Sequence, residues 1–436
     1  MSDLLSLAEW SVKRALEFGA GEAEVYVSTS VRRNVRSEGV HLKASASNTA
    51  QVEVRAALGK RVSIATASSL DKRVLEDIVR KAVELASKAE EDPHWNGLPD
   101  PEPAKHSWIG FDEGVATAEL SWLSELTRQL IDEAQVDPRV KVSGAGVGVS
   151  CGQTCIASSR NVAVEDRGTF FWAGLYLKAG EGAGGANMAS RSFTANLHPV
   201  IEKAVRQALD ASRATKLNES FKASVLFRAE PFAELLSTLL VPAFNAMNIL
   251  EGFSPLANKL SQNVLGSMTI LDDGTMPGGL STSLFDGEGV ARRKSLLVEN
   301  GVLKGYLHNT YTARRMGVHS TGNAVRARGI VGVGSSNLIV AGGSLPEKEL
   351  ENGARIIIEG GLLSVHTVNP ISGNFSVVAS NPYIVKDGEL VPIKPVAVSG
   401  NIYQLAYNIK LARRIKDTYS GIYTPDALIE GVTVSG

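Results

Sequence analysis

The sequence predicts an α+β protein in which an N-terminal α/β domain, an antiparallel meander with covering helices, precedes a β-rich C-terminal domain. Amphipathic helices and alternating runs share the first half, and short strands separated by glycine turns fill the second. The strands also cluster, whereas a doubly wound parallel sheet would alternate them with helices. We place the domains at residues 1–218 and 219–436, with a possible subdivision near 90–115.

Two amphipathic helices are predicted near the start of the chain. Apolar residues recur at helical spacing over 4–18, and Gly19 ends that pattern. A capping box at Ser68 and Asp71 precedes a second apolar stripe over 74–86. We expect this second helix to cover one face of a sheet.

The sheet beneath that helix is predicted to be an antiparallel meander. Three segments alternate between apolar and polar residues with the period of a strand, and turns at Gly39 and Gly59 separate them. The three segments are 22–27, 51–56 and 61–65.

A proline-rich stretch over 90–112 connects these elements to a second group of helices and strands. A helix over 117–134 is followed by three predicted strands between 140 and 178, and a further helix begins at Pro199. The glycine-rich segment 180–186 has neither the residues of a phosphate-binding loop nor the spacing of a dinucleotide fingerprint. We therefore predict a flexible loop there.

The second half of the chain is predicted to be β-rich. Hairpin signals occur at 299–302 and at 386–389, where Asn-Gly and Asp-Gly stand between alternating runs. Helices are expected over 231–250, near 310–316 and near 402–411.

Composition argues against several classes of partner. The formal net charge is −1, so no overall charge attracts nucleic acid. No window approaches the roughly 20 apolar residues of a spanning helix, and the first ten residues lack the features of a secretory signal. Cys151 and Cys155 lie too far apart along a strand for a disulfide, so we expect thiols. We therefore expect a cytoplasmic protein without nucleic-acid or membrane partners.

No catalytic constellation is apparent in the sequence. None of the seven histidines stands at the spacing from which a helix or hairpin builds a zinc site. Acidic residues gather in the segments 271–275 and 285–289, which can supply oxygen ligands to a hard cation or form tight turns. Turns are the favoured interpretation, because Asp-Gly pairs occur in both segments.

A series of motifs, strongest between residues 265 and 402, closely resembles the TldD/PmbA family. They are Asp-Asp-Gly-Thr-Met-Pro-Gly-Gly at 272–279, Phe-Asp-Gly-Glu-Gly-Val at 285–290, Val-Glu-Asn-Gly-Val-Leu-Lys-Gly-Tyr-Leu-His-Asn at 298–309, Ser-Thr-Gly-Asn-Ala at 320–324, Ser-Gly-Asn-Phe-Ser at 372–376 and Pro-Val-Ala-Val-Ser-Gly-Asn at 395–401. The resemblance implies a metallopeptidase fold.

Members of the TldD type look like metallopeptidases with a His-Glu-x-x-x-His helix before Leu-Glu-Gly and a distant cysteine as third ligand. Residues 250–252 supply that Leu-Glu-Gly here, so the histidine positions fall on Ala243 and Asn248 and the glutamate position on Phe244. The C-terminal half has no cysteine. The resemblance therefore implies a PmbA/TldE-like chain with no catalytic residue, no metal site and no cofactor, with zinc only in a TldD-like partner.

The leading hypothesis is a non-catalytic subunit that forms a heterodimer with a TldD-like metallopeptidase in peptide proteolysis or maturation. It would hold unfolded peptide substrate by strand addition, and would form a homodimer when alone. Two alternatives remain open. One is a stand-alone peptide-binding or regulatory protein, including the older family label of DNA gyrase modulator, and the other is an independent peptidase with an unrecognised site.

We expect a peptide groove whose wall includes the hairpin 297–308 and the loop 320–324. Polar and aromatic residues gather there beside glycines that let a backbone approach closely. The alternative is that these residues brace turns beneath the β-rich core. The candidate peptide-binding residues are Tyr306, His308, Asn309 and Asn323.

Overall fold

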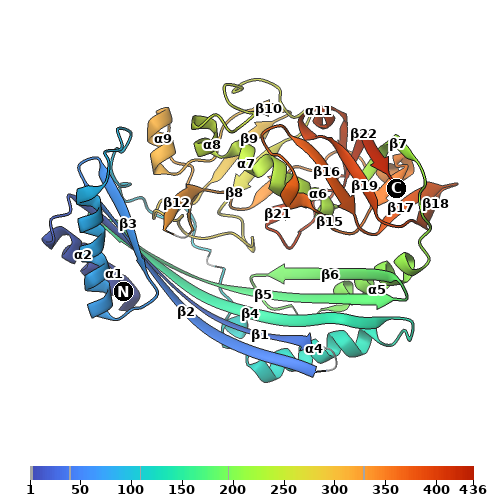
Figure 1. Cartoon of the computed structure of the whole chain (residues 1–436), viewed down its shortest axis with the longest axis horizontal. Coiled ribbons are helices and arrows are strands. Elements are labelled where there is room, and N and C mark those ends of the chain that lie inside the picture. The colour runs from blue at the N-terminus through green and yellow to red at the C-terminus, as the bar shows by residue number, and fades with distance from the viewer. Residues whose placement is uncertain (1–2, 39–40, 109, 195, 328) are drawn as a thin grey trace.

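A long curved sheet forms one half of the molecule, and a β-rich C-terminal domain lies over its concave face (Figure 1). The structure is a computed structural model that describes residues 3–38, 41–108, 110–194, 196–327 and 329–436. The predicted α+β class is confirmed. Among the described residues, no helix combines the length and the apolar character needed to cross a membrane.

The N-terminal sheet has six antiparallel strands in the part of the chain that the structure describes. β1 pairs with β2 from Glu22 opposite Ala57 to Glu38 opposite His41. β1 also pairs with β4, so the stretch near 90–115 joins two groups of strands that share one sheet. In sheet order the strands are β3 (Arg61–Ala67), β2 (His41–Leu58), β1 (Glu22–Glu38), β4 (Lys141–Ser158), β5 (Ala163–Ala179) and β6 (Gly182–Ser190).

The predicted meander is confirmed, but its strands are far longer than the alternating segments suggested. The alternation fades along β1 because residues such as Ser28 and Ser30 replace apolar ones on the concave face, which faces a hollow. The strands predicted between 140 and 178 are two long strands, β4 and β5. The turn at Gly59 is confirmed, whereas Gly39 lies outside the described residues.

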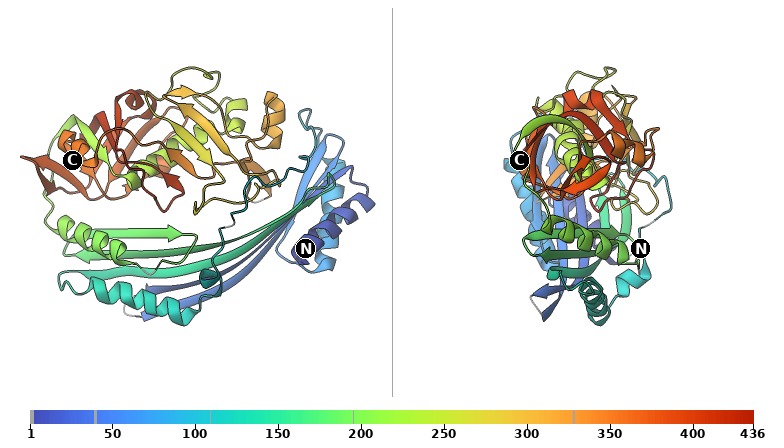
Figure 2. Two further views of the ribbon diagram at one scale, coloured as in Figure 1. Left: turned by 180° about the vertical axis from the view of Figure 1, so that it is seen from behind. Right: turned by 90° about the vertical axis from the view of Figure 1, so that its right-hand side faces the viewer.

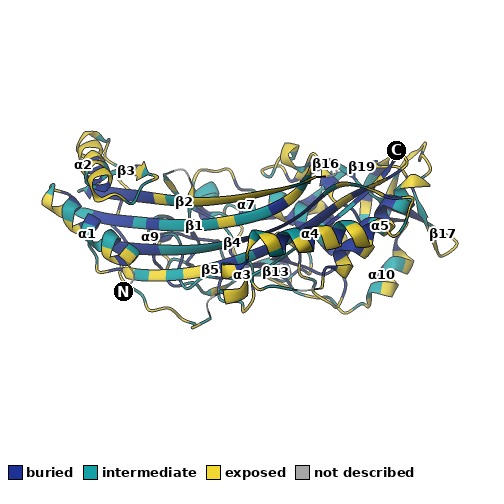
Figure 3. Ribbon diagram, turned by 90° about the horizontal axis from the view of Figure 1, so that it is seen from below, coloured by how far each residue is buried: buried dark blue, intermediate teal, exposed yellow. Residues whose placement is uncertain are grey.

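Four helices cover the convex face of the sheet, the face that turns away from the C-terminal domain. Two pack at one end of the sheet and two at the other, each pair over its own apolar core. Figure 2 shows the sheet between these helices and the C-terminal domain, and Figure 3 shows α4 crossing its underside. They are α1 (Asp3–Glu17), α2 (Lys72–Lys88), α4 (Leu120–Ala134) and α5 (His198–Ser212), with the short α3 (Glu113–Thr117) before α4.

β6 occupies the glycine-rich segment that was predicted to be a flexible loop, so that prediction is wrong from residue 182 onward. The glycines let the backbone of α5 lie directly against the strand. A Cβ at Gly182 would lie 2.3 Å from the backbone N of Ser212, and a Cβ at Gly184 would lie 2.4 Å from the backbone N of Ala208. Close helix packing therefore explains the glycines.

The C-terminal domain begins with β7, and the predicted boundary at residue 218 remains a prediction. The two predicted hairpins are confirmed as β9–β10 and β17–β18. In the described part, a nine-stranded sheet contains β7 (Ser220–Phe227), β14 (Ile356–Ile358), β15 (Leu362–Leu363), β16 (Asn374–Ala379), β17 (Pro382–Lys386), β18 (Glu389–Pro392), β19 (Val396–Asn401), β20 (Ile409–Leu411) and β22 (Ala427–Ser435). A five-stranded sheet contains β8 (Ile270–Asp273), β9 (Lys294–Glu299), β10 (Val302–Leu303), β13 (Leu338–Val340) and β21 (Ile422–Tyr423), and a two-stranded sheet contains β11 (Ala324–Ala327) and β12 (Ile330–Val333).

The helix predicted over 231–250 is interrupted. It consists of α6 (Ala229–Leu235), a π turn, α7 (Val241–Phe244) and α8 (Ala246–Leu250). The break lies at Asn245, whose backbone is extended and whose side chain accepts from the N–H of Met247 to cap α8. The helix near 310–316 is confirmed as α9 (Thr310–Met316), and the one near 402–411 is the short α11 (Ile402–Leu405) before β20. α10 (Glu347–Gly353) was not predicted.

Replacing Gly184 with alanine should destabilise the protein by roughly 1–3 kcal/mol, because the new methyl group overlaps the backbone of α5. Gly144→Ala is the matched control, since its nearest neighbour, Tyr176, would lie 3.8 Å from the methyl group. Chemical unfolding of both variants measures the difference. Equal free energies of unfolding would contradict the packing explanation of the glycines.

Candidate functional site

Two cavities lie between the concave face of the sheet and the C-terminal domain, and we call the space that contains them the hollow. Figures 1 and 2 show the C-terminal domain opposite the concave face. One cavity of about 530 Å³ lies between β4 and β5 on one side and the segment 281–287 on the other. The second, of about 740 Å³, lies beside β6 and α5 and faces the loop 359–363. Both cavities are therefore bounded jointly by the two halves of the chain.

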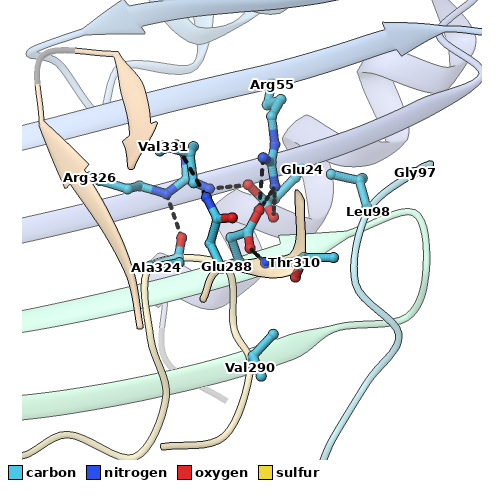
Figure 4. A network of polar contacts seen from close by, with 12 residues as sticks. Glu24, Arg55, Gly97, Leu98, Glu288, Val290, Thr310, Ala324, Arg326 and Val331 are labelled. Carbon is cyan, nitrogen blue, oxygen red and sulfur yellow. Dashed lines mark hydrogen bonds and ion pairs between the residues drawn. The ribbon is translucent and has the colours of Figure 1, made fainter. Parts of the chain in front are cut away.

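A cluster of five buried charged side chains joins the sheet to the C-terminal domain (Figure 4). Arg55 of β2 donates from Nη2 to Glu24 Oε2 of β1 and from Nη1 to Glu288 Oε1 of the C-terminal domain, both over 2.9 Å. Arg326 of β11 forms ion pairs with Glu24 of β1 and with Glu53 of β2. Each side chain is at most 4% exposed. We call these five residues the interdomain cluster.

The interdomain cluster depends on mutual pairing, because its charges lie away from water. Burial alone would lower the pKa of Arg55, but the carboxylates of Glu24 and Glu288 raise it above its ordinary value. Burial would likewise raise the pKa of Glu288, but Arg55 and the N–H of Thr310 lower it. Arg55 and Glu288 therefore each favour the charged form of the other.

The acidic segments singled out in the sequence are bonded to the turns around them. Asp286 accepts from three backbone N–H groups, and burial followed by the nearby Glu288 carboxylate raises its pKa. These contacts favour the turn interpretation. Within the described ranges, no three His, Cys, Asp or Glu side chains are grouped to hold a metal ion. The donors are Glu288, Val290 and Ala324 for Asp286, and Asn323 and Ser336 for Asp272.

The four predicted peptide-binding residues lie close together, and each is at most 5% exposed. The hydroxyl of Tyr306 donates to the carbonyl of Leu256 over 2.8 Å. The Nδ1 atom of His308 lies 3.2 Å from the hydroxyl of Thr312, and burial lowers the pKa of His308 to about 4. Both side chains therefore point into the protein.

The two asparagines also bond to the chain itself. Asn309 accepts from the N–H of Thr312 and caps α9. Asn323 donates to Asp272 over 2.8 Å and to the carbonyl of Gly334 over 3.0 Å. These contacts favour the bracing alternative, and contact between Tyr306, His308, Asn309 or Asn323 and a peptide stays a prediction.

The positions that correspond to zinc ligands in the TldD type do not fit a metal ion. Ala243 and Phe244 are at most 1% exposed, lie in the main core of the C-terminal domain and carry no donor atom. Asn248 donates from its side chain to the carbonyl of Pro242 over 2.8 Å. The extended backbone of Asn245 also separates the two helices that hold these positions. That this chain binds no metal stays a prediction.

Sequence reasoning missed the interdomain cluster. One signal was present, because Glu24 and Arg55 stand directly opposite each other in the predicted meander. Oppositely charged residues at facing positions of two strands indicate a cross-strand pair. No local pattern connects Glu288 or Arg326 with that pair, since both lie far along the chain.

Comparisons with known proteins identify relatives of both halves. Residues 220–436 match the family model described as the PmbA/TldA metallopeptidase C-terminal domain. Residues 115–211 match the model described as the PmbA/TldA metallopeptidase central domain. The two matches are separated by residues 212–219, which connect α5 to β7.

Relatives and a solved structure extend these matches over most of the chain. An uncharacterized protein of Methanocaldococcus jannaschii is 30% identical over 359 residues, which cover 81% of this chain and 82% of that one. A protein named Metalloprotease from Archaeoglobus fulgidus is 34% identical over 182 residues, 40% of this chain and 41% of that one. The crystal structure of TldE from Thermococcus kodakarensis has a TM-score of 0.91 at 23% identity over 99% of this chain and 100% of that one, so it shares the fold.

Replacing Arg326 with methionine should destabilise the protein by about 3–5 kcal/mol, because Glu53 would stay buried without a cation and Glu24 would keep only Arg55. Arg139→Met removes an exposed arginine that pairs with Asp137 and should leave the free energy of unfolding nearly unchanged. Chemical denaturation of both variants at pH 7 compares them. A small effect at Arg326 would show that the interdomain cluster contributes little.

Acidification should destabilise the protein partly through His308. Its pKa of about 4 lies below the ordinary value of 6.5, so the unfolded chain takes up this proton first and stability falls as pH drops from about 6.5 to 4. Between pH 7.5 and 5 this loss is about 2 kcal/mol. His308→Asn should remove that part of the decline, whereas the exposed His319→Asn is the matched control. Thermal melts of the parent and both variants at several pH values between 7.5 and 5 measure this contribution. An equal fall of melting temperature with pH in His308→Asn and in the parent would contradict the prediction.

Proposed function

This chain belongs to the TldD/PmbA family of metallopeptidases, and we propose that it is the non-catalytic, TldE/PmbA-like subunit of a two-subunit metalloprotease. Its partner would be a TldD-like metallopeptidase that supplies the zinc ion and the cleavage chemistry. The pair would act on unfolded peptides in the cytoplasm, in proteolysis or peptide maturation. Without that partner, the chain would pair with a second copy of itself.

The break at Asn245 is the observation that best supports a non-catalytic role. The His-Glu-x-x-x-His motif of the TldD type lies on one helix, where two histidines five positions apart, about 1.4 turns, must reach the same ion. Here the helix ends at Phe244 and restarts at Ala246, while Leu307 bonds to both sides of the break. Ala243 and Phe244 fill the core at the positions where ligand and base would stand. Both the backbone break at Asn245 and the apolar side chains of Ala243 and Phe244 thus disfavour metal binding.

The edge of β6 supports the second part of the proposal, that the hollow holds an extended peptide. β6 is the last strand of the sheet on its side. Side chains of Asn381 and Gln207 bond the outward carbonyl of Ala183 and the outward N–H of Gly185. Because alternate residues share a direction, the backbone groups of Asn187 and Ala189 also point outward. A peptide can add there as a further strand.

Side chains beside this edge suit a peptide of varied sequence. Tyr176, Leu363 and Tyr419 line the larger cavity and are 50%, 57% and 38% exposed. Exposed aromatic and aliphatic groups bury apolar side chains without selecting one residue type. Backbone pairing along β6 would supply the remaining affinity. The hollow therefore suits unfolded peptides as a class.

The purified chain should hold no stoichiometric zinc and should cleave neither casein nor an unfolded peptide. Cleavage should appear when a TldD-like subunit is added, and replacement of the zinc-binding histidines of that subunit should abolish it. Elemental analysis and a peptide-release assay on each subunit and on the pair measure both properties. One tightly held metal per chain, or cleavage by this chain alone, would favour an independent peptidase instead.

A further inference from the structure

The smaller cavity contains arginines that the protein itself leaves without a carboxylate partner. Arg167, Arg191, Arg292 and Arg326 line the cavity, together with Asp166 and Asp286, and the guanidinium group of Arg167 stacks on the ring of Phe111. Arg326 belongs to the interdomain cluster and is neutralised there. Among the ion pairs of the described residues, none includes Arg191 or Arg292. The guanidinium groups of Arg191 and Arg292 therefore place positive charge in the cavity without forming an ion pair with its walls.

Arg191 follows the last residue of β6 and lies across the concave face of the sheet. A Cβ on Gly168 would lie 2.4 Å from its Nη2 atom, so this glycine makes room for the guanidinium group. Its contacts with the carbonyls of Leu280 and Thr282 are both long, at 3.4 Å, and its buried Nε has no hydrogen-bond partner. Burial lowers the pKa of Arg191, and Asp166 offsets this only in part. The guanidinium group of Arg191 therefore has two long contacts with neutral carbonyls and, among the described residues, no close acidic acceptor.

Arg292 approaches the same segment from the C-terminal domain. Its Nε donates to the hydroxyl of Ser283 over 3.1 Å, and its Nη1 donates to the carbonyl of Gly322 over 2.6 Å. Both acceptors are neutral. Arg191 contacts the carbonyls at 280 and 282, so the two arginines flank one short segment of chain.

The carboxylates of the cavity are already engaged by backbone N–H groups. Asp166 accepts from the N–H of Leu284 and of Arg167, both over 2.8 Å, and burial raises its pKa. Asp286 accepts from three backbone N–H groups, as described above. Neither carboxylate lies within ion-pair distance of Arg191 or Arg292 in the described contacts. With Arg326 neutralised in the interdomain cluster, three arginines and two carboxylates remain in the lining, so the cavity carries one excess positive charge.

We propose that Arg191 and Arg292 bind the C-terminal carboxylate of an extended peptide that is added along β6. The inference rests on the proposed peptide-holding function and deepens it, because it states which end of the peptide lies where. Arg191 comes directly after Ser190, so a peptide that pairs with Asn187–Ser190 and continues past Ser190 runs towards the smaller cavity, where the guanidinium group lies over Gly168 of β5. A carboxylate there would accept from the Nη atoms, whose contacts with Leu280 and Thr282 are long, and would neutralise the excess charge. The peptide would run parallel to β6.

Binding of capped peptides to the full-length chain tests this assignment. The probes are one unstructured, N-acetylated and fluorescently labelled hexapeptide with a free C-terminal carboxylate, the same peptide with a C-terminal amide, and the amide with one internal glutamate. Fluorescence anisotropy should give at least about tenfold tighter binding for the free carboxylate than for either amide, because a charge-assisted bond is lost. Rescue of affinity by the internal glutamate would place a side-chain carboxylate in the site and would overturn the C-terminal assignment.

Two variants and one control locate the effect. Arg191→Gln should reduce the preference for the free carboxylate to less than about twofold and leave affinity for the amide unchanged. Ser150→Glu places a carboxylate on the cavity wall and should remove the same preference without removing an arginine. Arg139→Gln, which lies outside the cavity, should retain the full preference. Thermal melting of each variant shows whether the fold is kept. If Arg191→Gln unfolds, the carboxylate preference of Ser150→Glu alone tests the assignment.

The outcomes separate this inference from the proposed function. Equal affinity for carboxylate and amide, or an unchanged preference in a folded Ser150→Glu variant, overturns the carboxylate site while a peptide-holding role stands. No binding of any probe overturns the carboxylate site as well. The proposed function is then judged separately by whether cleavage requires the TldD-like subunit.

Discussion

The buried pairing of Arg55 and Arg326 with three glutamates is the interaction on which the rest of the structure depends. It crosses from the concave face of the sheet to the C-terminal domain and lies out of reach of water. Buried ion pairs add little net stability compared with apolar packing. Removing one partner, however, is strongly destabilising, because it leaves a buried charge without a counter-charge. Their geometry therefore fixes how the two halves of the chain face each other. Arg326 of the interdomain cluster also lines the smaller of the two cavities between the sheet and the C-terminal domain.

Within this frame, the chain keeps the architecture of a metallopeptidase family, and core residues fill the positions at which we predict the TldD type to carry its zinc ligands. Phe244 is fully buried, and the backbone at Asn245 serves the strand-like contact with Leu307. Restoring single ligands would not rebuild a site, because the helix that should carry them is discontinuous. We propose that the concave surface takes the substrate, at the β6 edge and at two arginines that form no ion pair among the described residues. These features suit holding a peptide more than cutting it.

The sequence predicted the fold where hydrophobic patterning was strong. The α+β class, the meander, α2 and both hairpins are confirmed, because buried valines and Asn-Gly or Asp-Gly turns are local signals. It failed where structure depends on distant contacts. Gly184 indicated a loop, since nothing local shows that α5 packs on it, and Asn245 breaks a helix that composition alone would continue. Of the site, motifs led to Asp286 and Glu288, but Arg191 became evident only once the hollow placed it opposite residues 280–283.

Hydrogen exchange of the chain with and without a saturating unfolded peptide tests the central claim most directly, because it needs neither catalysis nor a partner. If the hollow holds an extended peptide, amides of β6 near Asn187 and Ala189 should exchange more slowly when the peptide is bound, together with the segment 280–283. The convex face under α1 and α2 should not change. Protection confined to the convex face or to the outer surface of the C-terminal domain, with β6 unaffected, would contradict the account.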